Sequence, residues 1–226
     1  MISVVVPTNN SERLLPRCFD SLIAGAVRGV VREVIVSDAG STDSTLAIAD
    51  AAGAHVVRAC NNRSEQMIKA AAMAKSDWLL FLHPQTALEA GWEAEAESFL
   101  GQAVMERPRA GVFRFALEDF GGEARRAEAT ANLRAGLFAL PYGDQGLLIH
   151  RDLLREIGGV RPLPLMEDVD LVRRLGRHRL VALQADAVTS AAKWETGGYL
   201  RRSARNLTCL TLWFAGVPPS LIQRLY

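Results

Sequence analysis

The stretch Val34-Ile-Val-Ser-Asp-Ala-Gly-Ser-Thr-Asp-Ser-Thr45 decides the fold of this chain. An apolar, β-branched run ends at Asp38, and glycine and hydroxyl residues then lead into a helical pattern, as at the junction of a parallel strand with a helix. An aspartate at such a junction can accept hydrogen bonds from a base or a ribose, while Gly40 lets the backbone come close to a ligand. In the alternative interpretation, Thr42 and Asp43 only cap the following helix.

Strand and helix patterns alternate on both sides of this junction. Apolar runs predict strands at residues 2–7, 30–37, 54–58 and 78–82. Helical spacing predicts helices at residues 14–23, 42–52 and 64–75, with Ser41 or Thr42 as the cap of the second. This repetition predicts an α/β fold with a mostly parallel central sheet flanked by helices. Ligands of such sheets bind beyond the carboxyl ends of the strands, here the loops at residues 8–11, 38–43 and 83–86.

The second half of the chain is less regular. We expect helices at residues 92–105, 123–137 and 167–177, and strands at residues 111–117 and 146–150. The composition shifts near residue 194, because five basic residues but only one acidic residue, Glu195, follow from Lys193 onward. We therefore predict a domain at residues 1–192 and a C-terminal helical appendage at residues 193–226.

Composition and charge exclude some classes of protein and favour a location. The formal net charge of +1, without a basic stripe, gives no reason to expect nucleic acid as a partner. Cys18, Cys60 and Cys209 are scattered, which predicts buried free thiols in a reducing compartment. Met1 leads straight into a strand, and the longest apolar stretch near the end, residues 207–217, falls well short of the ~20 residues that cross a bilayer. We expect a cytoplasmic protein, with peripheral contact to the inner face of a membrane as an option.

The first two strand ends resemble the opening signature of family-2 glycosyltransferases. Val5-Val-Pro-Thr-Asn-Asn10, followed by the stretch at residues 34–45, carries this resemblance. It implies the GT-A fold, a Rossmann-like fold of nucleotide-diphospho-sugar transferases, and a nucleotide-sugar donor, a UDP-sugar in the first instance. In that family the first-strand loop and the aspartate bind the nucleoside, which carries over to Pro7, Thr8, Asn10 and Asp38.

Three later motifs resemble one bacterial subgroup of the same family. They are Arg63-Ser-Glu-Gln-Met67, Tyr142-Gly-Asp-Gln-Gly146 and Pro164-Leu-Met-Glu-Asp-Val-Asp-Leu171. The order of five motifs over about 190 residues makes the resemblance specific. It implies that Arg63 and Gln66 line the donor site, and that Asp144 and Gln145 lie near the acceptor or the sugar.

Glu167 and Asp168 are adjacent carboxylates at the start of an expected helix. A positioned carboxylate can take the proton from an attacking sugar hydroxyl, and such general-base catalysis contributes roughly 10²–10⁴-fold. Alternatively, these residues only favour the positive end of the helix, by about 0.3–1 kcal/mol each. The residues alone leave both interpretations open. The family resemblance implies an inverting transfer with Asp168 as general base and Glu167 supporting its position.

The metal-binding motif departs from the family pattern. Enzymes of this fold carry a DxD-type motif after the fourth strand, and the subgroup shows an HxDT-type motif instead. Here the chain reads His83-Pro-Gln-Thr86, so His83 and Gln85 occupy the metal-binding positions. Gln offers a neutral oxygen, a poor sole ligand for Mg²⁺ or Mn²⁺, so the metal is expected to be weakened or absent.

A second departure concerns the arginines expected near the end of the domain. Alanines stand at residues 191–192 in place of arginine. Either Arg63 and Lys193 stabilise the diphosphate without a metal, or the fold is kept while catalysis is weak or lost. The second possibility makes the chain a catalytically silent nucleotide-binding or interaction protein. A nucleotidyltransferase is disfavoured, because residues 8–13 supply no glycine-rich, basic phosphate loop.

The C-terminal tail carries an amphipathic helical pattern. Apolar residues from Leu200 to Phe214 fall on one stripe, with three arginines beside it. Residues 199–217 could rest on a membrane, form a homodimer or pack on the domain. The acceptor and the sugar are not identified by any spacing in the sequence.

Overall fold

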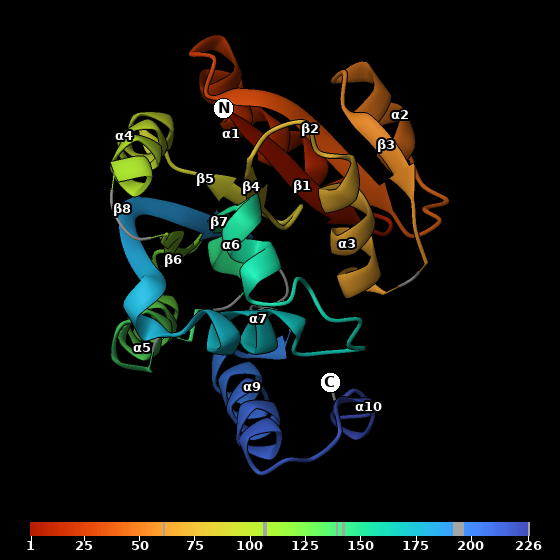
Figure 1. Ribbon diagram of the computed structural model, residues 1–226. Coiled ribbons are helices and arrows are strands. Elements are labelled where there is room, and N and C mark those ends of the chain that lie inside the picture. Colours follow the sequence, from red (N-terminus) through yellow and green to blue (C-terminus); the bar gives the residue numbers. More distant parts are fainter. Residues whose placement is uncertain (61, 106–107, 139, 142, 192–196, 226) are drawn as a thin grey trace.

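A computed structural model describes residues 1–60, 62–105, 108–138, 140–141, 143–191 and 197–225 (Figure 1). The strands are β1 (Ile2–Thr8), β2 (Val31–Asp38), β3 (His55–Arg58), β4 (Trp78–Phe81), β5 (Thr86–Leu88), β6 (Ala110–Leu117), β7 (Leu147–His150) and β8 (Leu180–Thr189). The helices are α1 (Leu15–Val27), α2 (Thr45–Ala51), α3 (Arg63–Met73), α4 (Trp92–Met105), α5 (Gly122–Phe138), α6 (Arg151–Glu156), α7 (Glu167–Leu175), α9 (Tyr199–Phe214) and α10 (Pro219–Ile222). Two short 3-10 helices are η1 (Gly143–Gln145) and η2 (Arg177–Arg179).

The strands form one eight-stranded sheet in the order β3-β2-β1-β4-β7-β6-β8-β5. The neighbours from β3 to β4 are parallel, as the sequence predicts for the first half. The second half is mixed, because β7 runs antiparallel to β4 and β6, and β5 runs antiparallel to β8. The register of β1 on β2 places Thr8 opposite Asp38. The two expected binding loops therefore leave the same edge of the sheet side by side.

Two apolar cores lie on opposite faces of the sheet, since successive strand residues point to opposite faces. Val4 and Val6 belong to the core that includes residues of α1, α2 and α4. Val5 belongs to the other core, with residues of α3, α6 and α7. Helices thus cover both faces, and the α/β prediction is confirmed. The cores hold the carboxyl ends of β1, β2 and β4 in fixed positions.

Besides the short 3-10 helices, four described strands and helices were not predicted from the sequence, and one predicted cap is wrong. The missed elements are β5, α6, β8 and α10, of which β5 has three residues and α10 four. Helix α2 begins at Thr45 after Ser44, without a side-chain cap. Ser41 and Thr42 instead bond to Asp38 and Asn10 in the preceding loops. These two hydroxyl residues join the strand-end loops rather than cap the helix.

The tail forms the helix that its pattern predicts, and this helix packs on the rest of the chain. Cys209 and Leu210 of α9 share an apolar cluster with Met166 and Val169 at the start of α7 and with Ile222 of α10. Figure 1 shows α9 and α10 below α7. Membrane contact and dimerisation stay predictions. In the described part of the chain, every helix is too short or too polar to span a membrane.

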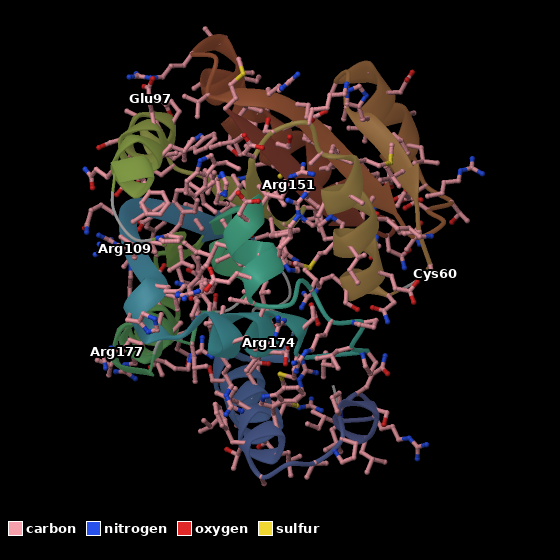
Figure 2. All side chains as sticks on the ribbon, in the orientation of Figure 1. Cys60, Glu97, Arg109, Arg151, Arg174 and Arg177 are labelled. Atoms are coloured by element: carbon pink, nitrogen blue, oxygen red, sulfur yellow. The ribbon has the colours of Figure 1, made fainter. Side chains whose placement is uncertain are left out.

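The cysteine prediction is correct for two of the three residues. Cys18 and Cys209 are buried, and burial raises the pKa of the Cys18 thiol to about 12. Cys60 is exposed and lies at the edge of the molecule beyond β3 (Figure 2). Cys60 follows β3 in a connection outside both cores, which is why burial was the wrong expectation there.

Candidate active site

The carboxylate of Asp38 organises the loops at the ends of β1 and β2. Its Oδ1 accepts hydrogen bonds from Thr8 Oγ1 at 2.9 Å and Ser41 Oγ at 2.5 Å, and its Oδ2 accepts from the backbone N–H of Gly40 and Ser41 at 2.9 and 2.8 Å. Burial raises the pKa of Asp38, but these bonds offset burial and hold it below the usual value. A base or ribose could bind Asp38 only by sharing or replacing one of these donors.

Asn10 joins the two strand-end loops from the other side. Its backbone N–H donates to Ser41 Oγ at 2.8 Å, and its Oδ1 accepts from the Thr42 N–H at 2.9 Å. Its φ of 49° is in the left-handed region, which asparagine tolerates better than most residues. Asp43 serves the start of α2, because its Oδ1 accepts from the Thr45 N–H at 3.0 Å. Asn10 and Asp38 therefore belong to one preformed loop pair.

Gln66, expected in the donor site, is directed at the backbone. It is 4% exposed, and its Nε2 donates to Thr8 O at 2.8 Å and to Ser37 O at 2.5 Å. These bonds hold the ends of β1 and β2 together. The structure thus places Gln66 beneath the strand ends, where it supports their geometry.

A cavity of about 230 Å³ lies beyond the carboxyl end of β4. It joins the positions after that strand to the start of α7 and to one face of α9. A smaller cavity of about 40 Å³ adjoins it, with Pro7, Arg63 and Glu167 in its wall. The larger cavity is lined by Arg63, His83, Gln85, Gly143, Asp144, Leu165, Met166, Asp168, Val169, Arg202, Asn206, Cys209 and Leu210.

Arg63 is the centre of an ionic cluster in this cavity. Its Nε donates to Glu167 Oε1, its Nη1 lies 2.9 Å from His83 Nε2, and its Nη2 lies 3.9 Å from Asp168 Oδ2. Burial lowers the pKa of Arg63, but the charges of Glu167 and Asp168 offset burial and raise it above its usual range. The guanidinium therefore stays charged.

Glu167 and Asp168 take different environments although they are neighbours. Glu167 is 2% exposed, and burial raises the pKa of its carboxyl above the usual value, with the charge of Arg63 opposing this only in part. Asp168 is half-buried and lines the larger cavity, whereas Glu167 lines only the smaller one. Met166, with a left-handed φ of 65°, precedes the pair and turns the chain into α7. Asp168 is thus the more accessible carboxylate of the pair.

Asp168 is held by the backbone of η1. Its Oδ2 accepts from the Gly143 N–H at 2.9 Å. A β-carbon at Gly143 would lie 3.0 Å from His83 Nε2 and 3.2 Å from Asp168 Oδ2. Glycine therefore permits the close approach of η1 to both side chains.

Asp144 and Gln145, neighbours in η1, point to different places. Gln85 Nε2 donates to Asp144 Oδ1 at 2.7 Å, and His83 Nδ1 lies 3.8 Å from the same oxygen. Gln145 is 2% exposed, and its Nε2 donates to Phe113 O at 2.9 Å. It lines a separate cavity beside β6. The structure therefore brings Asp144 to the candidate site and leaves Gln145 outside it.

The side chains at the metal-binding positions do not make a preformed site for a hard dication. The described residues contain no group of three or more His, Cys, Asp or Glu that could hold a metal ion. Gln85 presents its N–H₂ group to Asp144, and His83 Nε2 faces Arg63. Mg²⁺ and Mn²⁺ prefer several anionic oxygen ligands, so this donor set fits them poorly.

Arg202 and Asn206 of α9 line the cavity and were not predicted as site residues. They lie one turn apart, on the face that also carries Cys209. The arginines at the start of the tail pattern were a signal, but one sequence does not tell which arginine faces inward. Tyr142 of the predicted loop motif, and Lys193, lie outside the described residues.

The chain resembles known proteins in sequence. Residues 3–92 match the family model "Glycosyl transferase family 2". Over 110 residues the chain is 34% identical to the "PGL/p-HBAD biosynthesis glycosyltransferase" of Mycobacterium tuberculosis and to that of Mycobacterium bovis. The aligned stretch covers 45% of this chain and 42% of these relatives, less than half of their length.

Solved structures share the fold over most of the chain. Glucosyl-3-phosphoglycerate synthase from Mycobacterium tuberculosis, in complex with Mn²⁺ and UDP-glucose, gives a TM-score of 0.62 at 21% identity, over 96% of this chain and 80% of that one. S. aureus TarS 1–349 gives a TM-score of 0.63 at 16% identity, over 85% and 61%. The shared fold is the GT-A fold.

Proposed function

We propose that this chain, whose residues 3–92 match the model of glycosyl transferase family 2, transfers a sugar from a nucleoside diphosphate donor to an acceptor hydroxyl. The observation that carries the proposal is the larger cavity, which joins the Asp168 carboxylate to the residues that follow β4. In parallel sheets this edge is the usual place for a ligand. A base and a donor could therefore meet in one cavity.

We propose that the reaction is a single displacement with inversion. The acceptor oxygen forms a bond to the anomeric carbon while the bond from that carbon to the diphosphate breaks. The acceptor proton moves to Asp168, which has lone pairs left beside its bonds to the Gly143 and Val169 N–H groups. Glu167 is a positioning residue in this scheme, because it holds Arg63, and Arg63 stands 3.9 Å from Asp168.

The donor in this proposal is a UDP-sugar. Several of the solved structures that share the fold contain UDP-glucose or UDP. We place the nucleoside over Pro7, Thr8 and Asp38 at the ends of β1 and β2, and the diphosphate near Arg63 in the cavity. No step is assigned to a metal, because the side chains at His83 and Gln85 fit a dication poorly. Mn²⁺ is present in the related synthase.

A second candidate function is a binding protein that has kept the fold without catalysis. The hydrogen bond from Gln85 to Asp144 favours it, since an amide and a carboxylate pair where the family places metal ligands. The presentation of Asp168 to the cavity favours the enzyme. Turnover separates these candidates, whereas nucleotide binding alone does not.

The first test is the binding of UDP, GDP and their sugar conjugates by isothermal titration calorimetry, with Mn²⁺ and then with EDTA. We expect UDP to bind and EDTA to leave its affinity unchanged. A large loss of affinity in EDTA would show that the donor site needs a metal. Absence of binding by any nucleotide to the folded protein would rule out the proposed donor site.

The second test is Asp168→Asn with the bound sugar nucleotide as substrate, scored as donor hydrolysis or as transfer to an acceptor mixture. We expect turnover to fall by roughly 10²–10⁴-fold while the UDP affinity changes much less, because the substitution removes the proposed proton acceptor. Asp152→Asn is the matched control, since that side chain is 73% exposed and lines neither cavity. Equal loss of binding and turnover would make Asp168 structural.

A further inference from the structure

The wall of the cavity formed by α9 is polar and basic at one end and apolar at the other. Arg202 and Asn206 line the cavity beside Asp144 and Asp168. Cys209 and Leu210, further along the same face, are buried in the apolar cluster with α7 and α10. The apolar end anchors the helix, and the polar end is left facing the volume in which Asp168 stands.

The negative charge in the cavity makes the basic end of this wall important for the reaction. The cavity holds the carboxylates of Asp144 and Asp168, and Glu167 lies directly behind Arg63. A departing diphosphate adds negative charge to this volume, and stabilising such developing charge is usually the largest contribution to catalysis. The site therefore needs cationic groups that can reach the diphosphate.

Arg63 is largely committed to the protein itself. Its three nitrogens face Glu167, His83 and Asp168. It can share its charge with a ligand, but its donors are directed into the cluster. The described metal-ligating side chains supply no dication site to make up the difference. Among the described residues, Arg202 is the second arginine that lines the same cavity.

We propose that Arg202 binds the diphosphate of the donor and stabilises it as the leaving group. The inference rests on the proposed function and assigns its leaving-group contact to a helix that follows the family-matched segment. A guanidinium presents a planar set of N–H donors that matches two phosphate oxygens at once. In this proposal Arg202 supplies the positive charge that the family resemblance led us to expect from arginines at residues 191–192.

Asn206 supports the same assignment from one turn away. Its Oδ1 is buried and accepts no hydrogen bond from the described residues. A buried polar atom of this kind is costly unless a ligand or water satisfies it. Its position in the cavity wall beside Arg202 suits a hydroxyl of the transferred sugar.

The test compares uridine, UMP and UDP on four proteins, the unmodified chain and three variants, with EDTA present throughout. Arg202→Met keeps most of the side-chain volume and removes the charge. Arg201→Met is the matched control, because Arg201 is the exposed neighbour on the same helix. Affinities are measured by isothermal titration calorimetry, and thermal melting confirms that each variant is folded.

We expect Arg202→Met to weaken UDP on the order of 10- to 100-fold, the range of a lost charge-assisted hydrogen-bond pair, while uridine binding is unchanged. Arg201→Met should change all three affinities by less than about twofold. Arg202→Lys should recover part of the UDP affinity, since it restores the charge without the planar fork.

Three results would overturn the inference. Equal UDP affinity for Arg202→Met and the unmodified protein would show that Arg202 does not bind the diphosphate. Parallel weakening of uridine, UMP and UDP would make Arg202 a structural residue. If the unmodified protein binds none of the three, the proposed function itself fails, whereas the first two results leave that function standing.

Discussion

At the residue scale, the Asp38 carboxylate ties together the loops at the ends of β1 and β2. Its two oxygens accept four hydrogen bonds from Thr8, Gly40 and Ser41. Asparagine at this position would turn an N–H₂ group toward at least one of these donors. We expect Asp38→Asn to lower the free energy of unfolding by about 2–3 kcal/mol at neutral pH. Urea unfolding followed by circular dichroism measures this difference.

The pKa of Asp38 gives this prediction a pH dependence. The folded protein holds this carboxyl below its usual pKa of 3.8, so the unfolded chain binds the proton more tightly. The stabilisation is therefore present above pH 3.8 and is lost as the pH falls through the lowered value. The difference in the free energy of unfolding between Asp38→Asn and the unmodified protein should become smaller in that pH range. A gap that stays constant would show that the charge of Asp38 contributes nothing.

Gly143 lies where there is little room for a side chain. The added β-carbon of Gly143→Ala would stand 3.0 Å from His83 Nε2 and 3.2 Å from Asp168 Oδ2, so these side chains must shift by a few tenths of an ångström. We expect the kcat of sugar transfer to fall by roughly 10- to 100-fold, because misplacing a catalytic group is costly. The KM for the donor should change little. Gly101→Ala is the control, since nothing lies within 4 Å of its added carbon, and an unchanged kcat for Gly143→Ala would contradict the prediction.

The sequence predicted which residues lie near the cavity better than it predicted where their side chains point. Motifs named Arg63, His83 and Asp168, and the structure brings these three together in one cavity. Gln66 and Gln145 came from equally specific motifs, yet their amides donate to backbone oxygens. A motif fixes where a residue stands along a strand end or helix. The direction of a glutamine side chain depends on which backbone groups need a partner, and a single sequence does not list those.

At the scale of the element, α1 contains a glycine that its neighbours require. A β-carbon at Gly25 would lie 2.7 Å from Trp92 Cζ2 and 2.9 Å from Val31 Cγ2, and Trp92 is fully buried. Gly25→Ala should therefore lower the free energy of unfolding by about 1–3 kcal/mol, through overpacking. Gly101→Ala in α4, an exposed helical position, should raise it by about 0.5–1 kcal/mol. Chemical denaturation of both variants checks the opposite signs, and stabilisation by Gly25→Ala would contradict the close packing of α1 on α4.

Strands and helices could be predicted from the sequence where a local pattern of apolar residues was clear. The strands β1 to β4 are apolar or β-branched runs between helical patterns, and their parallel pairing follows from that alternation. Strand β8 is a different case, because Gln184 and Asp186 interrupt it and much of it is only half-buried. It pairs with β6 and β5, which lie far from it in the sequence. Long-range pairing of this kind overrides local propensity and leaves little trace in a local pattern.

At the scale of the whole molecule, α10 holds α9 against the body. Ile222 is fully buried in the cluster that contains Cys209 and Leu210. Ile222→Ala leaves a void there, and truncations of this kind cost about 2–5 kcal/mol. We expect faster amide hydrogen exchange across residues 199–214 and weaker UDP binding, although Ile222 is outside the cavity wall. Leu221→Ala is the control, because Leu221 is 49% exposed.

The Ile222→Ala experiment distinguishes a tail that only packs on the domain from a tail that forms part of the donor site. If exchange in α9 rises and UDP affinity stays the same, the helix is not part of the donor site. The predicted boundary after residue 192 treated residues 193–226 as an appendage. That boundary lies outside the residues that the structure describes, and it stays a prediction. The lining of the cavity by Arg202 argues that the segment after it completes the site.

The ion pair between Arg63 and Glu167 spans 104 positions of the chain. This separation has a consequence for biosynthesis. A ribosome adds about 5–20 residues per second, so Arg202 follows Asp38 by on the order of ten seconds or more. The nascent chain can thus present its nucleoside-side loops well before the carboxylate and the guanidinium that would act on a bound donor. An interrupted translation product that stops before Asp168 would lack both the proposed base and the residues of α7 that complete the core around Val5.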